Sequence, residues 1–593
     1  MSATLFAAIV TLLPQAPLQV EVTPRGKEPF SATWAVATVA LDTDFGNAIV
    51  KAAHLAQIQF GEPDVVVTDS GTELRGELKQ KTLELKVDGK QKRITAGELA
   101  TLVVVRDGKA LGMPSFDGEW MTSFGPMRLQ QRGASVKGDY GFGSSGTIEG
   151  KVKNGVLEYS YRSDGGSGAG TWKLEEADDV LLGRYGQNGK DEGFWGAYRK
   201  KAVTPDLKPG EVVQGQTKAG LRFFARAPKA HSSGKTWPAI CMLHGSNMTS
   251  RAYVDTIVGT WPQLAEEFVV VGLDGERISE GSKPGALAFN YTYINFGGPD
   301  VGPAWANRQS PALVADSLEQ LGKELPVTKW FLGGHSQGGF LTYCLVMYYP
   351  QLLAGAFPMS CNLLVQCEPD EFDDKAHSAQ HRLAVAVIHG RKDDVVDFDG
   401  GAYCHLRLLD GGFPRLRLFA PDNVGHQFAW LPVADAVHWL QQSTTDDDEA
   451  LLAFAEARAG EKAWRDVGAA LQRFDQKKPA AALQGRVDAL QKVLAKVAEP
   501  PAKKIADAVS KDQSGKWADD FLAFRGEFAT AAAAQPVLAV YDSLRQQQKK
   551  KGDELFYKAR GMEKKEERQA IYREILKTCF ATKWYAAVKL WMD

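Results

Sequence analysis

Three residues that together could carry out acyl transfer follow one another along the chain. Ser336 lies in the segment GHSQG (334–338), Asp393 comes 57 residues after it, and His426 comes 33 residues after Asp393. A serine hydroxyl is a poor nucleophile until an adjacent base takes its proton, and a carboxylate orients that base. The residue types and their order therefore predict a serine nucleophile, an orienting aspartate and a histidine base.

The acid of this set has competitors nearby. Asp393 lies in the segment HGRKDDVV (389–396), where Asp394 follows it directly and Asp397 is close by. An aspartate after a strand can also serve as the cap of the next helix. The residue types alone therefore leave the choice between these carboxylates open.

Acyl transfer also needs hydrogen-bond donors for the negative oxygen of its tetrahedral intermediate. One donor is predicted to be the backbone N–H after the nucleophile, on Gln337. The second is predicted in the segment LHGSN (243–247), where we favour the N–H of Ser246 over that of Asn247. Gly245 in this loop would let the backbone come close to the reacting atoms.

The other histidines are not assigned to the chemistry. His244 and His335 are expected to be structural rather than acid–base groups, and His389 and His405 lack an argument for a partner. No group of residues has the spacing of a metal site. The sequence therefore predicts neither a metal nor a cofactor.

The candidate residues need a scaffold that presents them at one edge of a sheet. Residues 204–445 alternate near-continuous apolar runs, which are typical of buried parallel strands, with helical segments. The expected strands are 239–243, 268–274, 329–334, 354–360, 383–390 and 415–420, and the expected helices are 311–325, 340–349 and 432–442. Ser336 thus falls in a tight strand–turn–helix connection, and Asp393 and His426 follow strands. The pattern predicts a doubly wound α/β domain.

At this point residues 237–442 resemble the α/β-hydrolase superfamily, on the side of the phospholipase/carboxylesterase and feruloyl-esterase-like enzymes. The segments LHGSN, GGHSQGG, HGRKDDVV and GHQF carry the resemblance. The family pattern HG-x-x-D-x-x-V puts the acid on Asp393. The resemblance implies an αβα sandwich with a mostly parallel sheet and ester hydrolysis without a cofactor. An insert at 275–309 departs from the family and is expected to act as a lid or substrate wall.

The flanking regions differ in pattern from the α/β domain. Residues 1–19 hold a candidate signal peptide, 20–114 indicate a small all-β module, and 115–203 indicate a β-meander or small barrel, with a packed spacer favoured over a ligand pocket. Residues 446–593 predict an all-α region of hairpins, irregular and of the tetratricopeptide type. We expect helix breaks there at Lys478-Pro479, Pro500-Pro501 and Gln535-Pro536.

Composition limits the class of protein. The net charge of −2 over 593 residues gives no reason to expect a nucleic-acid partner. No segment has the length of uncharged apolar residues that a transmembrane helix needs. The six cysteines are far apart, and only Cys361 and Cys367 are close enough to suggest a local bridge.

The sequence thus favours a serine esterase that cleaves a carboxylic ester of a small molecule or a polysaccharide-linked group. One alternative is a serine peptidase of the prolyl-oligopeptidase type, although about 200 preceding residues are too few for the propeller of such enzymes. The other is a non-catalytic binding or scaffold protein. Export to the periplasm or beyond is expected, with a cytoplasmic location as the alternative, and the C-terminal helices are a candidate surface for a protein partner.

Overall fold

A computed structural model describes residues 17–592 with several gaps. The gaps are 45, 69–72, 107–108, 111–114, 123, 133, 142–145, 154, 164–165, 176–179, 188–189, 246–247, 275–305, 363–381, 512–513 and 563. Residues 1–16 and most of the predicted insert therefore lie outside the described residues, as does Cys367. Export and the role of the insert stay predictions. Residues 18 and 19, which we assigned to the candidate signal segment, begin the first strand.

The described residues fall into two compact units that divide between Lys200 and Lys201. The first unit begins with an 11-stranded antiparallel sheet in the order β4-β3-β7-β6-β5-β10-β1-β2-β8-β9, with β11 paired to β10. Its strands are β1 (Leu18–Pro24), β2 (Phe30–Trp34), β3 (Thr38–Thr43), β4 (Gly46–Lys51), β5 (Leu55–Gln59), β6 (Asp64–Thr68), β7 (Glu73–Leu78), β8 (Thr82–Val87), β9 (Lys90–Thr95), β10 (Leu99–Arg106) and β11 (Lys109–Ala110).

The second sheet of this unit closes on itself. Its order is β17-β16-β15-β14-β13-β12-β20-β18-β19, and β17 also pairs with β18, which closes the strands from β12 to β18 and β20 into a ring, with β19 paired to β18. The strands are β12 (Gly118–Thr122), β13 (Gly125–Arg132), β14 (Ser135–Tyr140), β15 (Gly146–Lys153), β16 (Val156–Ser163), β17 (Gly166–Glu175), β18 (Val180–Gln187), β19 (Lys190–Phe194) and β20 (Ala197–Arg199). Buried aromatic rings pack inside it: Tyr159 stacks on Trp172 at 3.9 Å, and Trp172 donates to the carbonyl of Trp195.

The second unit holds the α/β domain. Its 8-stranded sheet has the order β21-β22-β24-β23-β25-β26-β27-β28, with parallel pairing from β24 to β28 and antiparallel pairing at β21 and β22. The strands are β21 (Val212–Gln216), β22 (Arg222–Arg226), β23 (Trp237–Leu243), β24 (Val269–Leu273), β25 (Val327–His335), β26 (Gly355–Met359), β27 (Ala384–Ile388) and β28 (Arg415–Phe419). The predicted strand 329–334 is the inner part of β25, the strand that leads to Ser336.

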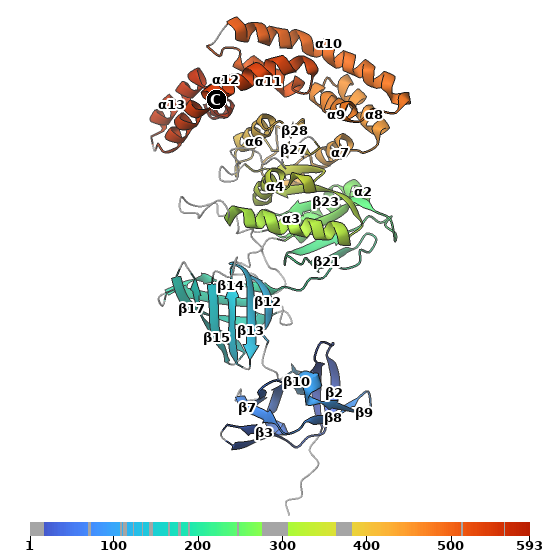
Figure 1. The fold of residues 1–593 in the computed structure, drawn as a ribbon, viewed down its shortest axis with the longest axis vertical. Helices are drawn as coiled ribbons and strands as arrows, with labels where there is room; N and C mark the ends of the chain where they lie inside the picture. The colour runs from blue at the N-terminus through green and yellow to red at the C-terminus, as the bar shows by residue number, and fades with distance from the viewer. Residues whose placement is uncertain are drawn as a thin grey trace, which may run out of the picture. The chain divides into compact units, whose positions relative to one another are not determined.

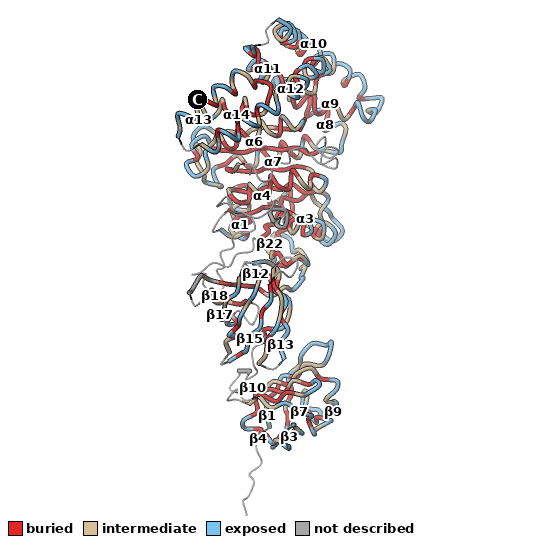
Figure 2. The backbone as a smooth tube through the Cα atoms, turned by 60° about the vertical axis from the view of Figure 1, so that its left-hand side comes forward, coloured by how far each residue is buried: buried red, intermediate tan, exposed pale blue. Residues whose placement is uncertain are grey.

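Helices cover both faces of this sheet (Figure 1). They are α1 (Ser250–Thr260), α2 (Pro262–Glu267), α3 (Ala306–Glu324), α4 (Gln337–Tyr348), α6 (Phe398–Asp410) and α7 (Val433–Ser443). Successive side chains of a strand point to opposite faces, so in β23 Cys241 and Leu243 pack with α3, α4 and α6, while Ile240 and Met242 pack with α1, α2 and α7. The sheet and the helices against it form the continuous buried part of the unit in Figure 2.

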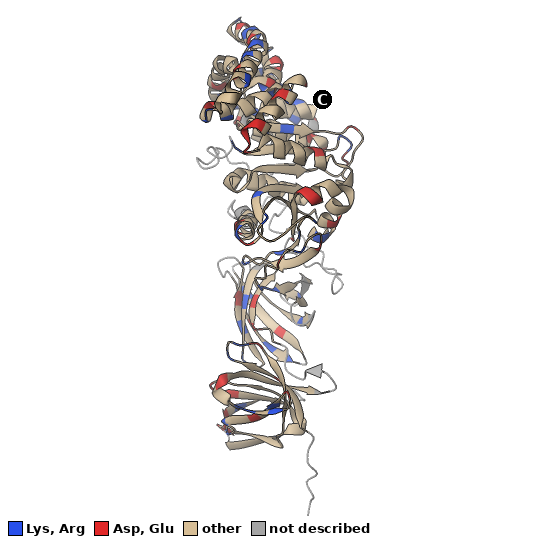
Figure 3. Ribbon diagram, turned by 90° about the vertical axis from the view of Figure 1, so that its right-hand side faces the viewer, with Lys and Arg blue, Asp and Glu red and all other residues tan. Residues whose placement is uncertain are grey.

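The C-terminal region consists of seven α-helices among the described residues. They are α8 (Asp448–Gly460), α9 (Trp464–Gln476), α10 (Ala481–Lys511), α11 (Ala518–Phe528), α12 (Gln535–Arg560), α13 (Lys565–Thr578) and α14 (Lys583–Met592). Their unequal lengths do not match the helix pairs of a 34-residue tetratricopeptide repeat. Both basic and acidic residues are distributed along these helices (Figure 3), and Arg486 pairs with Glu449 and Glu456.

The predicted break at Pro500-Pro501 is wrong, because α10 runs through both prolines from Ala481 to Lys511. A proline inside a helix removes a hydrogen bond and clashes with the preceding turn, which usually ends the helix. Here Leu494, Ala498 and Ala502 continue one buried stripe past the prolines. Packing of that stripe holds the helix together at the place where local preference would interrupt it.

The helical region shares its core with the α/β domain. Leu440 of α7, Leu451 of α8 and Leu471 of α9 belong to one buried cluster. Arg465, which is also buried, donates to the carbonyl of Phe413 in the α/β domain at 3.1 Å. Helices α8 and α9 thus pack against the α/β domain and share its hydrophobic core.

Candidate active site

Ser336 occupies a strained turn between β25 and α4. Its backbone has φ 53° and ψ −120°, a region that non-glycine residues rarely adopt and that costs about 1–3 kcal/mol. Three hydrogen bonds hold it there: its N–H donates to the carbonyl of Met359 at 2.9 Å, and its own carbonyl accepts from Gly339 and Phe340. Such strain is a feature of the elbow that the GHSQG segment predicts, because it pushes the serine out of the strand toward substrate.

Glycines around the elbow permit the close packing that this turn requires. A Cβ on Gly334 would lie 2.1 Å from the carbonyl oxygen of Gly338, and one on Gly338 would lie 2.1 Å from that of Leu243. A Cβ on Gly339 would lie 2.4 Å from the sulfur of Cys361. Only glycine fits at these three positions, so strand and helix approach as the sequence predicts.

Asp393 and His426 lie together at the same edge of the sheet. The Nδ1 atom of His426 is 3.0 and 2.9 Å from the two carboxylate oxygens of Asp393, in the loops after β28 and β27. The Asp393 side chain is buried, and it also accepts hydrogen bonds from the N–H groups of Val395 and Val396. Asp394, the competitor, is exposed. The geometry brings Asp393 rather than Asp394 to the histidine.

His389 is a further partner of Asp393 that the sequence did not identify. Its Nε2 lies 2.8 Å from the carbonyl of Val396 and 3.4 Å from the Oδ2 of Asp393, so one N–H faces both acceptors. Burial raises the pKa of Asp393, but the hydrogen bonds from His389, His426 and the two valine N–H groups outweigh it and hold the pKa well below its usual value. The signal was present, since His389 is the first residue of the HG-x-x-D-x-x-V pattern.

His335, next to the nucleophile, connects three segments of the site. Its Nε2 donates to the carbonyl of His426 at 2.7 Å, because a carbonyl can only accept. The Nδ1 of a neutral ring therefore accepts from the hydroxyl of Tyr253 at 2.8 Å, and that hydroxyl oxygen accepts from the N–H of Gly245 at 3.2 Å. Burial, with the nearby charge of His426, lowers the pKa of His335 to about 4. The neutral ring thus joins the loop of Gly245, the elbow and the backbone of His426.

Only one of the two predicted oxyanion-hole donors, the N–H of Gln337, lies within the described residues. Gln337 is the first residue of α4, and the N–H groups of a first helical turn point out of the helix end toward developing negative charge. Ser246 and Asn247 lie outside the described residues. Their neighbour Gly245 is described: a Cβ built on it would be 3.3 Å from the Cβ of Ser336. The N–H of Gly245 itself donates to the hydroxyl of Tyr253, and the choice of Ser246 as the second donor stays a prediction.

Among the described residues, no hydrogen bond joins the hydroxyl of Ser336 to the ring of His426, a contact that often tightens only when substrate is bound. Burial lowers the pKa of His244 to about 4 and that of His405 to about 3, so both rings are neutral.

In the part of the chain that the structure describes, no cluster of three or more His, Cys, Asp or Glu side chains could hold a metal ion. None of the described helices combines the length and the apolar character needed to cross a bilayer.

Comparison with known proteins points to one family. Residues 306–411, which contain Ser336 and Asp393, match the phospholipase/carboxylesterase family. A curated relative, acyl-protein thioesterase 1 of Aspergillus fumigatus, is 23% identical over 136 residues, which are 22% of this chain and 54% of that protein. The chain thus spans about half the length of the curated relative it matches.

Solved structures match a larger share of the chain. The carboxylesterase of Bacillus cereus is 15% identical, with 37% of this chain and 93% of that chain covered and a TM-score of 0.29. Acyl-protein thioesterase 2 of Zea mays is 18% identical, with coverage of 37% and 97% and a TM-score of 0.27.

Proposed function

We propose that this chain, which carries an α/β-hydrolase domain of the phospholipase/carboxylesterase type, is a serine hydrolase that cleaves a carboxylic ester through an acyl-enzyme. The observation that supports this most directly is the pairing of His426 with buried Asp393 at the sheet edge where strained Ser336 also lies. The order of the three residues along the chain, the strained backbone of the serine and the pairing of the histidine with the aspartate are all typical of a catalytic triad.

In the proposed reaction the Nε2 of His426 takes the proton of the Ser336 hydroxyl. At the same time the hydroxyl oxygen of Ser336 attacks the carbonyl carbon of the ester. Asp393 holds the imidazole by its Nδ1–H and stabilises the positive charge that the ring gains. The negative oxygen of the intermediate is stabilised by the N–H of Gln337 and, as predicted, by that of Ser246. His426 then returns the proton to the departing alcohol. Water repeats the sequence on the acyl-enzyme and releases the acid.

The peptidase alternative receives no support from the described β regions. An enzyme of the prolyl-oligopeptidase type carries a propeller of radially repeated blades. The described parts of residues 17–200 form one antiparallel sheet and one closed ring instead. The curated match to a thioesterase makes a thioester the second substrate to test beside oxygen esters.

Labelling of the full chain with a fluorophosphonate, followed by peptide mass analysis, tests the nucleophile. We expect a single adduct on Ser336 and its loss in His426→Ala, since the hydroxyl then lacks its base. His438→Ala, which removes a surface histidine paired with Glu267 in the same domain, is the matched control and should label normally. An adduct on another serine, or undiminished labelling of His426→Ala, would refute the assignment.

Hydrolysis of p-nitrophenyl esters from acetate to octanoate, an acyl thioester and an aminoacyl anilide tests the substrate class. Ser336→Ala should lower kcat on the preferred ester by roughly 10⁴- to 10⁶-fold while the protein stays folded. Faster turnover of the anilide than of every ester would favour the peptidase. No turnover of any substrate and no labelling would favour the scaffold.

A further inference from the structure

A pocket lies at the edge of the sheet opposite the proposed catalytic site. Its volume is about 740 Å³, within the usual range for small-molecule sites. It is lined by the amino-terminal ends of β25 and β28, the segment before β26, and helices α3 and α9. Ser336 follows the carboxyl end of β25, so this pocket is separate from the proposed catalytic site.

Basic side chains predominate in the described lining. It contains two acidic residues, Glu319 and Asp446, and five basic ones: Lys323, Lys329, Arg382, Arg415 and Arg473. Asp446 is almost fully exposed and lies 3.8 Å from Arg473. The described lining therefore carries an excess of three positive charges.

Arg415 is the strongest single observation. It is only 9% exposed, yet its one described hydrogen bond is from Nη1 to the carbonyl of Arg382 at 2.9 Å. Its Nε is buried without a partner, and no carboxylate in the described residues pairs with it. Burial first, and then the positive charge of Arg473, lower its pKa to about 10. Buried guanidinium groups are normally paired with an anion.

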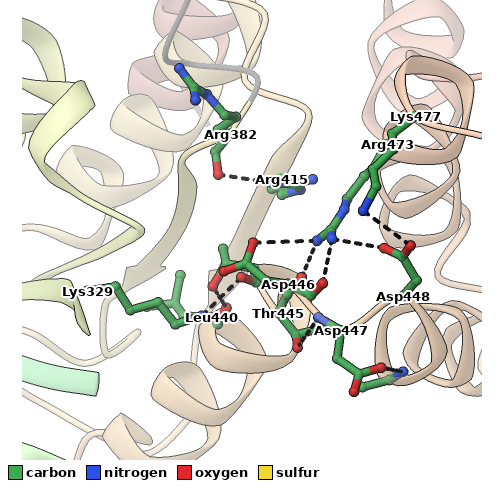
Figure 4. Close-up of polar contacts among 12 residues, drawn as sticks. Lys329, Arg382, Arg415, Leu440, Thr445, Asp446, Asp447, Asp448, Arg473 and Lys477 are labelled. Carbon is green, nitrogen blue, oxygen red and sulfur yellow. Dashed lines mark hydrogen bonds and ion pairs between the residues drawn. The ribbon is translucent and has the colours of Figure 1, made fainter. Parts of the chain in front are cut away.

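Two more cations face the same space (Figure 4). In that view Arg415, from β28, has its drawn contact with Arg382, and the guanidinium group of Arg473 extends from α9 toward Asp446 and Asp448. Lys329 donates to the carbonyl of Thr444 at 3.1 Å, and burial lowers its pKa, although the negative charge of Asp446 partly opposes this. Arg473 is held by Asp448 at 2.9 Å. Arg415 and Lys329 form no hydrogen bond or ion pair with a carboxylate among the described residues, and the exposed carboxylate of Asp446 acts on both only through its charge.

Apolar side chains from α3, β25 and the segment before β26 complete the lining. They include Leu318, Val327, Trp330, Leu352 and Leu353. An inorganic anion would use only the charged part of such a surface, whereas an anion with a hydrocarbon body would contact both. Guanidinium groups recognise carboxylate and phosphate by paired hydrogen bonds.

We propose that this pocket binds a small organic anion, a carboxylate or phosphate head on an apolar body, with Arg415 and Lys329 as the ligands of the head. The ligand sits between the sheet and α9, so it also ties the C-terminal helices to the α/β domain. The site is distinct from the ester-binding site and does not depend on the chemistry proposed for Ser336.

Calorimetric titration of the full chain with hexyl phosphate and with hexanoate tests the proposal, with inorganic phosphate and hexanol as the probes of head and body alone. At least one of the two organic anions should bind more tightly than either probe, and the affinity should fall as salt is added. Whichever binds better identifies the head. Absence of binding by both organic anions at millimolar concentration, or binding of inorganic phosphate as tight as that of hexyl phosphate, would overturn the proposal.

Substitutions in the lining test whether the anion binds in this pocket. Arg415→Gln and Lys329→Gln should each raise Kd by about tenfold or more, the usual loss for a hydrogen bond to a charged group. Arg417→Gln is the matched control: Arg417 lies two residues along β28, packs on Phe419 at 4.6 Å and does not line the pocket, so its Kd should equal that of the parent. Ser336→Ala should also bind normally. Unchanged affinity in both pocket variants, or loss of binding in Ser336→Ala, would contradict the site, and circular dichroism verifies that each variant is folded.

Discussion

The two edges of the central sheet treat a buried charge in opposite ways. At the carboxyl edge, Asp393 is 7% exposed and its carboxylate faces the rings of His389 and His426 and two backbone N–H groups. At the amino edge, Arg415 is 9% exposed and has one carbonyl as its described partner. The protein satisfies the first charge by itself and leaves the second open to a ligand. We propose a function for both buried charges, and their partners distinguish the two proposed roles: Asp393 is already bound to a histidine base, whereas Arg415 would bind a ligand.

The largest loss of activity should follow substitution of Asp393, at the carboxyl edge of the sheet. Asp393→Asn keeps the shape of the side chain but removes the acceptor that sets the histidine tautomer, so kcat should fall by up to about 10⁴-fold. Asp394→Asn, one residue on and exposed, should change kcat little. Steady-state hydrolysis of the preferred ester measures both. If Asp394→Asn were the more damaging variant, the acid would be misassigned by one residue.

A smaller loss should follow when the ring beside the nucleophile is replaced. His335→Leu removes the hydrogen bonds to Tyr253 and to the carbonyl of His426, and a base displaced by about 1 Å can lose on the order of 100-fold in rate. His335→Gln can still accept from the hydroxyl and donate to the carbonyl, so it should retain most of kcat. Equal activity of the two variants would show that His335 does not position His426.

The same histidine should make stability depend on pH. Its pKa is about 4 when folded and about 6.5 when unfolded, so between these values the unfolded chain binds more protons and stability falls as pH falls. From pH 7 to pH 5 this single group should lower the free energy of unfolding by about 2 kcal/mol. Urea unfolding followed by tryptophan fluorescence should show a smaller pH dependence for His335→Gln than for the parent. An unchanged dependence would mean that folding does not lower the pKa of this ring.

The smallest effect, a change in the free energy of unfolding, is expected for substitution of Arg415 at the amino edge of the sheet. Arg415→Met replaces a buried, unpaired charge by an apolar side chain of similar length, so the free energy of unfolding should change by less than about 1 kcal/mol or increase. Urea unfolding without added anion measures it, with Arg417→Met as the control on the same strand. A loss well beyond that amount would show that the folded chain already compensates Arg415, and the contrast between the edges would disappear.

The elements near the site could be predicted from sequence to different degrees. The parallel strands β23–β28 were predicted because long apolar runs bounded by turn residues leave few alternatives. Helix α6 was missed since it carries Gly400 and Gly401, poor helix formers. The structure explains one of them: a Cβ on Gly401 would lie 2.3 Å from the Nδ1 of His389. The two antiparallel strands β21 and β22 and helices α1 and α2 were also missed.

The amino-acid sequence by itself determined the order of Ser336, Asp393 and His426, the glycines of the elbow and the strand that precedes each candidate. These are local features: a turn type or an apolar run depends on neighbours along the chain. Only the tertiary structure shows that Asp393 and not Asp394 contacts the histidine, that Tyr253 and His335 connect across 82 residues, and that buried Arg415 faces a pocket whose described lining has an excess of basic residues. Such pairings depend on distances between strands and helices far apart in sequence, and only packing of the whole domain sets them.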